Sequence, residues 1–349
     1  MSDDAAGPPV LTRVDRGVGV ITLNRPRKIN AVTTEMLGLV EQALDGWERD
    51  DAVESVLLRG AGPRGFCAGG DITAVHHDAT VDPARNVEMW RREYRGTLRL
   101  SLYPKPIVSW LDGLAMGAGI GLGGHVTLRV VSPRSALGMP ETVIGLTPDA
   151  GGSFLLSRAP GQLGTHLALT GRTMTAADAL LIGFADVLVP VEGEDGGDVV
   201  LDALATGGLE AVRALSVASP SSPLDASRDW IDEGYEGDDA QEIVARLRRM
   251  ESDGNAEAGA AADDLEAASP TSVVLTLAAQ RRAATLPDLA AVLGQELGLV
   301  TALADAPDLV EGIRARVVDK DRSPRWSPAT LREVDVDAAL AAVDWQTRL

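Results

Sequence analysis

Short apolar runs alternate with helix-like stretches through the first half of this 349-residue chain. The runs are rich in Val, Ile and Leu and span residues 18–23, 53–58, 106–111 and 126–131. Between the first two runs, Thr33 and Thr34 offer N-caps for a helix with apolar residues on one face. A second helix is expected over residues 116–124, despite its glycines. Strands separated by helices are typical of α/β proteins, so we predict that fold class.

The composition changes after Pro190, which suggests a different organisation for the second half. Residues 192–198 are acidic and rich in glycine, and we expect a loop there. Residues 228–268 hold 13 acids and 4 basic residues, which is typical of solvated surface helices. The sequence 269–272 then offers a cap for a helical region that continues to about residue 305. We therefore predict three successive parts: a core over 1–190, an acidic helical insertion or linker over 191–268, and a C-terminal helical region over 269–349.

Charge and cysteine content exclude several functional classes. The net charge of −19 repels a phosphate backbone, so we expect no nucleic-acid partner. The single cysteine, Cys67, excludes an intramolecular disulfide framework and a cysteine zinc site, and we expect no metal. The N-terminus lacks a signal pattern, and the apolar stretch 114–124 is too short to span a bilayer. We expect a cytoplasmic protein without membrane association.

Two glycine-rich loops each follow a predicted strand. Gly119, Gly121 and Gly124 fit the spacing G-x-G-x-x-G, but the next strand ends in Ser-Pro-Arg, where a dinucleotide site needs an acid. This favours close helix packing over a dinucleotide site. The loops 66–72 and 112–121 could each present free backbone N–H groups, and two such donors form an oxyanion hole. Tight turns explain the glycines equally well. Cys67 is expected to be a small packed residue.

Two carboxylates, Glu141 and Asp149, lie in a mostly apolar segment punctuated by Pro140, Gly145 and Pro148. Burial in such surroundings raises the pKa of a carboxyl group, which suits acid–base or nucleophilic chemistry. The alternative is structural: an acid in the first turn of a helix at position 141 and a cap at position 149.

Together these segments resemble a known family. The carriers are Phe66-Cys-Ala-Gly-Gly-Asp-Ile72, Met116-Gly-Ala-Gly119, Met139-Pro-Glu-Thr142 and Pro148-Asp-Ala-Gly-Gly152. They resemble the crotonase (enoyl-CoA hydratase/isomerase) superfamily. The C-terminal sequences Ser269-Pro-Thr-Ser272 and Glu311-Gly-Ile-Arg-Ala-Arg-Val-Val-Asp-Lys-Asp-Arg-Ser-Pro-Arg-Trp326 resemble its 3-hydroxyisobutyryl-CoA hydrolase branch.

The resemblance implies a core spiral of ββα units with C-terminal helices around it, and an acyl-CoA thioester substrate. It implies that the backbone N–H groups of Ala68 and Ala118 form the oxyanion hole. The loop carrying Gly69, Gly70, Asp71 and Ile72 would line the pocket for the CoA adenine. Lys28, in a small basic cluster, would meet the CoA phosphates, or it is ordinary surface charge. No separate cofactor is expected, because CoA is part of the substrate.

The resemblance also assigns roles to three acids. Glu141 would be the nucleophile or the general base at the thioester carbonyl. Asp149 would hydrogen-bond the substrate hydroxyl or help to move protons. Glu93 matches a position that contacts substrate, and a solvated helix acid is the alternative. One departure is Ala118, where the family commonly has glycine, and its methyl group could narrow the acyl pocket.

These expectations converge on a thioesterase for short 3-hydroxyacyl-CoA substrates, with 3-hydroxyisobutyryl-CoA, an intermediate of valine breakdown, as the expected substrate. An enoyl-CoA hydratase or isomerase is one alternative, and a non-catalytic acyl-CoA-binding protein is another. Hydration in this family uses two glutamates, and the second would fall at position 121, where this chain has glycine. The superfamily often forms trimers or hexamers, so a homo-oligomer is possible.

Overall fold

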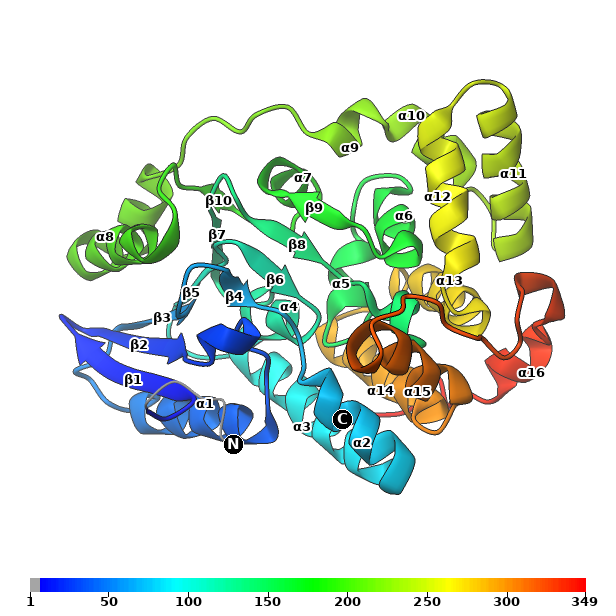
Figure 1. Ribbon diagram of the computed structural model, residues 1–349. Coiled ribbons are helices and arrows are strands. Elements are labelled where there is room, and N and C mark those ends of the chain that lie inside the picture. Colours follow the sequence, from blue (N-terminus) through cyan, green and yellow to red (C-terminus); the bar gives the residue numbers. More distant parts are fainter. Residues whose placement is uncertain (1–6) are drawn as a thin grey trace. The chain divides into compact units, whose positions relative to one another are not determined.

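The structure, a computed structural model, describes residues 7–349 (Figure 1). The described chain forms two compact units that interleave along the sequence. Unit 1 holds the segments up to Gly70, Arg95–Gly138 and Met174–Ser222. Unit 2 holds Asp71–Tyr94, Met139–Thr173 and Pro223–Leu349. The limits of these units differ from the three successive parts expected from composition.

A six-stranded sheet forms the centre of unit 1, in the order β1-β2-β3-β5-β7-β10. Its strands are β1 (Val10–Asp15), β2 (Val18–Leu23), β3 (Ser55–Gly60), β5 (Ile107–Trp110), β7 (Leu128–Val131) and β10 (Val187–Leu188). Strands β1 and β2 are antiparallel, and every other neighbouring pair is parallel. The turn between β1 and β2 places Arg16 at φ 50° and Gly17 at φ 80°, the positive values of a two-residue hairpin loop.

A second sheet has the order β4-β6-β8-β9. Its strands are β4 (Gly65–Cys67), β6 (Leu114–Met116), β8 (Ala136–Gly138) and β9 (Thr173–Thr175), the last of which lies at the limit of the two units. Both β4–β6 and β6–β8 are parallel pairs. The short helix α4 (Ala118–Gly123) follows β6. A Cβ atom at Gly119 would lie 2.8 Å from the Cys67 carbonyl oxygen, so close packing explains this glycine.

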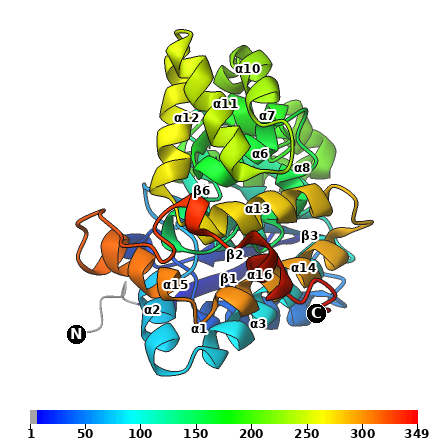
Figure 2. The ribbon, with the colours of Figure 1, turned by 90° about the vertical axis from the view of Figure 1, so that its right-hand side faces the viewer.

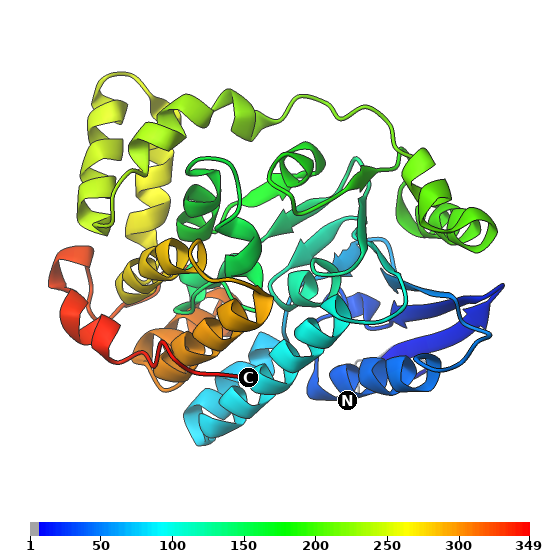
Figure 3. The same cartoon turned by 180° about the vertical axis from the view of Figure 1, so that it is seen from behind.

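Helices cover the central sheet of unit 1. Helix α1 (Thr34–Trp47) is capped by the Thr33 side chain and lies along the β1–β2 hairpin (Figures 1 and 3). Helix α8 (Gly193–Ala214) packs Val200, Leu201 and Leu204 into the apolar core of the sheet. Unit 1 also contains α7 (Ala176–Leu181) and the 3-10 turn η1 (Pro26–Lys28).

The prediction of a loop over residues 192–198 is wrong, because most of this segment is the start of α8. Its acids Glu194 and Asp195 lie in the first turn, where negative charge stabilises a helix. A Cβ atom at Gly196 would lie only 2.4 Å from the Trp110 ring. The glycine that suggested a loop therefore permits close packing of a helix.

Unit 2 is mainly helical. Before residue 175 it contains α2 (Ile72–Val81), the 3-10 turn η2 (Glu141–Ile144), α5 (Gly152–Leu156), α6 (Leu163–Thr170) and the first part of α3 (Ala84–Ser101). After residue 222 it contains α9 (Pro223–Ala226), α10 (Arg228–Gly234), α11 (Ala240–Ser252), α12 (Ala256–Ala267), α13 (Pro270–Ala283), α14 (Leu289–Leu303), α15 (Pro307–Ile313), the π-helix η3 (Arg314–Val318), the 3-10 turn η4 (Leu331–Glu333) and α16 (Val336–Ala341).

The acidic segment 228–268 forms packed helices. Helices α11 and α12 lie side by side (Figures 1 and 2) and bury small and branched apolar residues. On the outer faces, Arg248 pairs with Glu251, Asp263 and Glu266. The expectation of surface helices is therefore confirmed, with an apolar side that composition alone did not indicate.

The Ser269 side chain caps α13 as expected, by accepting a hydrogen bond from the Ser272 N–H. The helical region that follows is two helices, because it breaks between α13 and α14. Among the described residues, no single helix has the length and apolar composition to cross a membrane, and one bent pair, Leu289–Leu303 with Pro307–Val318, meets those two criteria together.

Candidate active site

Four carboxylic acids are buried together in unit 2. They are Glu93 on α3, Glu141 at the start of η2, Asp149 in the following loop, and Glu296 on α14. Each is less than 8% exposed, and their charges act on one another. Buried acids of like charge resist ionisation, and such groups are characteristic of catalytic sites.

Glu141 occupies the first position of η2, a turn that ends at Gly145. Gly145 has φ 81°, and a Cβ atom there would lie 2.4 Å from the Asp308 carbonyl oxygen, so glycine is required. Burial raises the pKa of Glu141 well above its usual range, and the charge of Asp149 adds to the effect. Its Oε2 atom is buried and has no hydrogen-bond partner among the residues that the structure describes. An orphaned buried carboxylate oxygen is costly, which makes it a candidate contact for a ligand.

Asp149 lies in the loop between η2 and α5. The Tyr94 hydroxyl donates a hydrogen bond of 2.6 Å to Asp149 Oδ2. Burial raises the pKa of Asp149 to about 6, and the hydrogen bond from Tyr94 opposes this rise. Asp149 can therefore exchange a proton close to neutral pH.

Glu93 faces this cluster from α3. The alternative of a solvated helix acid is wrong, because the side chain is 6% exposed. Burial raises its pKa well above the usual range, and Asp149 and Glu296 add to the rise. The structure thus brings together the three acids predicted from the sequence.

Glu296 is a fourth member that the sequence analysis missed. It is fully buried, and its two oxygens accept the backbone N–H groups of Gly151 and Ser153 at 2.7 and 3.0 Å. The signal that could have found it is an acid inside the apolar run of α14, a position where acids are rare unless they have partners.

The two glycine-rich loops meet within unit 1. A Cβ atom at Gly69 would lie 4.0 Å from the Ala118 nitrogen, so the loop after β4 and the start of α4 are in close contact. Ala118 is the first residue of α4, and a helix provides no internal acceptor for its first N–H groups. Gly117 precedes it with φ 48°, a conformation that favours glycine.

The predicted donor Ala68 is not free in this structure. Its N–H donates to the Ile29 carbonyl oxygen at 2.8 Å, so this amide is committed to the fold. In the same loop, the Gly69 carbonyl accepts the Val32 N–H at 2.8 Å. The sequence could not reveal these bonds, because the partners lie in a distant part of the chain.

The remaining predicted residues lie on an exposed turn, at the start of a helix, or in the core. Lys28 is exposed at the end of η1 in unit 1. In unit 2, Asp71 is the N-cap residue of α2 and Ile72 is its first residue. Cys67 is buried, in agreement with the expected packing role.

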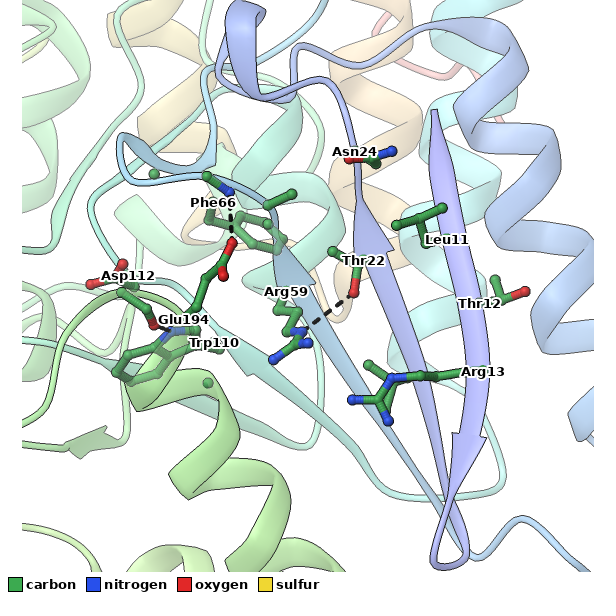
Figure 4. A pocket seen from close by; sticks show the side chains of 17 residues that line it. Leu11, Thr12, Arg13, Thr22, Asn24, Arg59, Phe66, Trp110, Asp112 and Glu194 are labelled. Atoms are coloured by element: carbon green, nitrogen blue, oxygen red, sulfur yellow. Dashed lines mark hydrogen bonds between the residues drawn. The ribbon is translucent and has the colours of Figure 1, made fainter. Parts of the chain in front are cut away.

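A pocket of about 350 Å³ lies at the carboxyl ends of β2, β3 and β5 in unit 1 (Figure 4). Its wall includes Arg59, which donates to the Thr22 hydroxyl, and Glu194, which accepts the Gly62 N–H. Trp110 also lines it and donates from Nε1 to the Gly193 carbonyl. None of the site residues predicted from the sequence lines this pocket.

Comparison with known proteins decides the family. The model of the enoyl-CoA hydratase/isomerase family matches residues 18–343. The chain belongs to this family. The predicted family is thereby confirmed, as is the α/β fold class.

Relatives of this enoyl-CoA hydratase/isomerase family member include named hydrolases. The mitochondrial 3-hydroxyisobutyryl-CoA hydrolase of Danio rerio is 35% identical, over 99% of this chain and 92% of that protein. The human protein of the same name is 34% identical, over 90% of this chain and 83% of its own length. The expectation of an enzyme similar to these hydrolases is confirmed. The expected cytoplasmic location is wrong, because the names of these relatives point to mitochondria.

Solved structures of the family carry different names. A carnitinyl-CoA dehydratase from Mycobacterium thermoresistibile is 46% identical with a TM-score of 0.90, covering 97% of this chain and 98% of that one. An enoyl-CoA hydratase from Rhodobacter sphaeroides is 39% identical with a TM-score of 0.90, covering 97% of both chains. The family thus includes similar proteins named for hydrolysis and for addition or removal of water.

Proposed function

We propose that the protein hydrolyses the thioester of short 3-hydroxyacyl-CoA substrates, with 3-hydroxyisobutyryl-CoA as the preferred one. The observation that carries the proposal is the buried Glu141 carboxyl group, whose Oε2 atom has no partner among the described residues. The near-complete length of similarity to named 3-hydroxyisobutyryl-CoA hydrolases supports the choice of substrate.

In the proposed reaction, Glu141 acts on the thioester carbonyl carbon. As a general base it takes a proton from water while the water oxygen bonds to that carbon. As a nucleophile its carboxylate oxygen bonds to the carbon first, and water then cleaves the anhydride. In both routes the C–S bond breaks and the CoA thiolate leaves and takes up a proton. A single turnover in ¹⁸O-labelled water separates the general-base route from the nucleophilic route in which water attacks the Glu141 carbonyl carbon of the anhydride, because that attack leaves ¹⁸O in Glu141 and the general-base route leaves it only in the product acid.

The oxyanion donors we propose are the N–H groups of Gly70 and Ala118. Gly70 replaces Ala68 in this role, because the Ala68 N–H already binds the Ile29 carbonyl. The Gly69 carbonyl points toward the Val32 N–H, and a trans peptide directs the N–H of the next residue the opposite way. A Cβ atom at Gly70 would meet nothing within 4 Å, so there is open space beside this residue.

Asp149 is proposed to accept a hydrogen bond from the substrate 3-hydroxyl group, and Glu93 to contact the same end of the substrate. Lys28, exposed in an acidic protein, is proposed to bind a CoA phosphate together with the loop from Gly69 to Ile72. CoA enters as part of the substrate, and the proposal includes no separate cofactor. The protein is also proposed to form a homo-oligomer, such as the trimers or hexamers of the superfamily, and sedimentation measurements test this.

A hydratase or dehydratase is the second candidate, favoured by the names of the two similar solved structures. The residue at position 121 argues against it. The family resemblance places a second water-activating glutamate there, and Gly121, buried in α4, has no side chain to hold or deprotonate water.

A panel of acyl-CoA substrates assayed for free thiol tests the proposed function. We expect 3-hydroxyisobutyryl-CoA to give the highest kcat/KM, and isobutyryl-CoA and acetyl-CoA to give lower values. No thiol release from any member would exclude hydrolysis of these thioesters and would leave hydration, the second candidate, or acyl-CoA binding without turnover.

A further inference from the structure

Glu296 is a buried acid to which the proposed reaction gives no role. It lies on the mostly apolar helix α14, between Gln295 and Leu297, and is 0% exposed. A buried carboxyl group destabilises a fold unless its oxygens are satisfied, and an apolar residue of the same size is often at least as stable. Both oxygens are satisfied here, by N–H groups from a single short segment.

That segment is the turn that follows Asp149. Ala150 has φ 50° and Gly151 has φ 86°, so two successive residues adopt the left-handed conformation. This conformation is disfavoured for a residue that has a Cβ atom, as Ala150 does. The turn is closed by a bond of 2.6 Å from the Gly152 N–H to the Asp149 carbonyl. An unfavourable backbone needs support from its surroundings.

Glu296 provides this support from another helix. Gly151 is the N-cap residue of α5, and Ser153 lies in the first turn of that helix. Glu296 Oε2 accepts the Gly151 N–H and Oε1 accepts the Ser153 N–H, so one carboxyl group binds the start of α5 at two points. A second bond, from the Ser153 hydroxyl to the Pro148 carbonyl at 2.9 Å, fixes the opposite side of the turn. The position of Asp149 is thereby tied to α14.

We propose that Glu296 is a positioning residue for Asp149, holding the turn from Asp149 to Ser153 so that the Asp149 carboxyl group meets the Tyr94 hydroxyl and the substrate. This role rests on the proposed function, because it gives a purpose to the position of Asp149. Glu296 itself is not proposed to contact the substrate.

The ionisation of Glu296 gives its positioning role a pH dependence that a purely structural residue would not show. Burial raises the pKa of Glu296 to about 8, the charge of Asp149 adds to this, and the two N–H donors oppose it. The other titratable groups of the cluster are Glu93 and Tyr94 on α3 and Glu141 on η2. Ionisation of Glu296 above this pH strengthens its hold on the turn and adds a negative charge near Asp149 and Glu141.

Glu296→Gln is the test variant, because an amide has the same shape but offers only one oxygen to two N–H donors. The matched control is Asp178→Asn. Asp178 is a buried carboxyl group in α7 that accepts the Thr175 N–H at 2.9 Å, and it takes no part in the proposed chemistry.

We expect hydrogen exchange of the peptide covering 149–153 to speed up about tenfold or more in Glu296→Gln and to stay unchanged in Asp178→Asn. We expect kcat for thiol release to fall on the order of 10–100-fold, because a small misplacement of a reacting group is costly. KM should change less than about threefold. We expect kcat of the wild-type protein to show an inflection near pH 8, and we expect that inflection to be absent in Glu296→Gln and retained in Asp178→Asn.

The wild-type protein provides a test that needs no variant and no turnover. The amide NMR resonances of Gly151 and Ser153 should shift with a common midpoint near pH 8 as their acceptor ionises. Fixed resonances, or unchanged exchange and kcat in a folded Glu296→Gln, would overturn the positioning role. If the wild-type protein releases no CoA while these resonances titrate and the exchange responds, the proposed hydrolase function fails and the hold of Glu296 on the turn stands.

Discussion

The Tyr94 hydroxyl donates a 2.6 Å hydrogen bond to Asp149 Oδ2, and both groups are buried. This bond stabilises the ionised form of Asp149 against the effect of burial, which raises the pKa of the group to about 6. The pair therefore sets the pH at which the site gains its negative charge. It also ties α3, which carries Glu93, to the loop that carries Asp149.

Tyr94→Phe should move the acidic limb of activity to higher pH. The hydrogen bond lowers the pKa of Asp149, so its loss raises the pKa above about 6. The ionised form of Asp149 is the one that accepts the substrate hydroxyl, so the rise in activity with pH should begin later. The pH dependence of kcat/KM between pH 5 and pH 9 measures this. An unchanged midpoint would mean that Asp149 does not control that limb.

The free energy of unfolding should also depend on pH, because the pKa of Asp149 is raised in the folded state. A carboxyl group with a raised pKa stabilises the fold fully below its unfolded value and loses that contribution as pH rises through its folded value. For Asp149 this window runs from about pH 4 to about pH 6. In Tyr94→Phe the upper limit of the window should move upward, which a series of thermal melts across pH reports.

Glu141→Gln should remove most thioesterase activity and leave CoA binding nearly intact. The amide keeps the shape of the side chain but can neither attack a carbonyl nor accept a proton from water. A positioned acid or base contributes on the order of 10²–10⁴ in rate, so kcat should fall by at least about 10². Thiol-release kinetics and calorimetric titration with CoA give the two quantities. Turnover near the wild-type value would remove Glu141 from the mechanism.

Asp149→Asn should lower turnover of hydroxylated substrates more than of plain acyl-CoA substrates. A hydrogen bond to a charged group contributes about 1.5–3 kcal/mol, so the ratio of kcat/KM for 3-hydroxyisobutyryl-CoA to that for isobutyryl-CoA should drop at least about tenfold. The same pair of substrates measured with Asp178→Asn is the control. Equal losses on both substrates would assign Asp149 to the thioester chemistry or to the fold instead.

Gly119→Ala should disturb the contact between the two glycine-rich loops. The added methyl group would lie 2.8 Å from the Cys67 carbonyl oxygen and 2.9 Å from Cys67 Cβ, so the backbone must move. Overpacking of this kind costs about 1–3 kcal/mol, and kcat should fall as well. Gly46→Ala is the matched control, because a Cβ atom there meets nothing within 4 Å and alanine favours the helix. Denaturant unfolding that ranks the two variants in the opposite order would contradict the close packing.

The sequence alone predicted much of the fold. The apolar run 18–23 coincides with β2, and the Thr33 and Ser269 caps begin helices as expected. The strands β4, β6 and β8 were missed because three residues are too few to display an alternating pattern. Strand β1 was missed although its hairpin turn includes Gly17, since Arg16 is an unusual residue for a positive φ.

The site was predicted in part, for physical reasons that differ among its residues. Glu141, Asp149 and Glu93 lie in segments whose motifs resemble the family, and the structure places all three in one buried cluster. Glu296 has no such motif, and its partners are backbone N–H groups far away in the sequence. The hydrogen bond from the Ala68 N–H to the Ile29 carbonyl could not be predicted either, because a backbone hydrogen bond depends on which segments the fold brings together.

The proposed reaction is hydrolysis of a thioester by a family member that lacks a side chain at position 121. Its most direct test compares 3-hydroxyisobutyryl-CoA in a thiol-trapping assay with crotonyl-CoA in an assay of enoyl absorbance, at the same enzyme concentration. We expect rapid release of CoA from 3-hydroxyisobutyryl-CoA and slow loss of the enoyl absorbance. Fast loss of enoyl absorbance with little free CoA would contradict this expectation and would assign the protein to hydration.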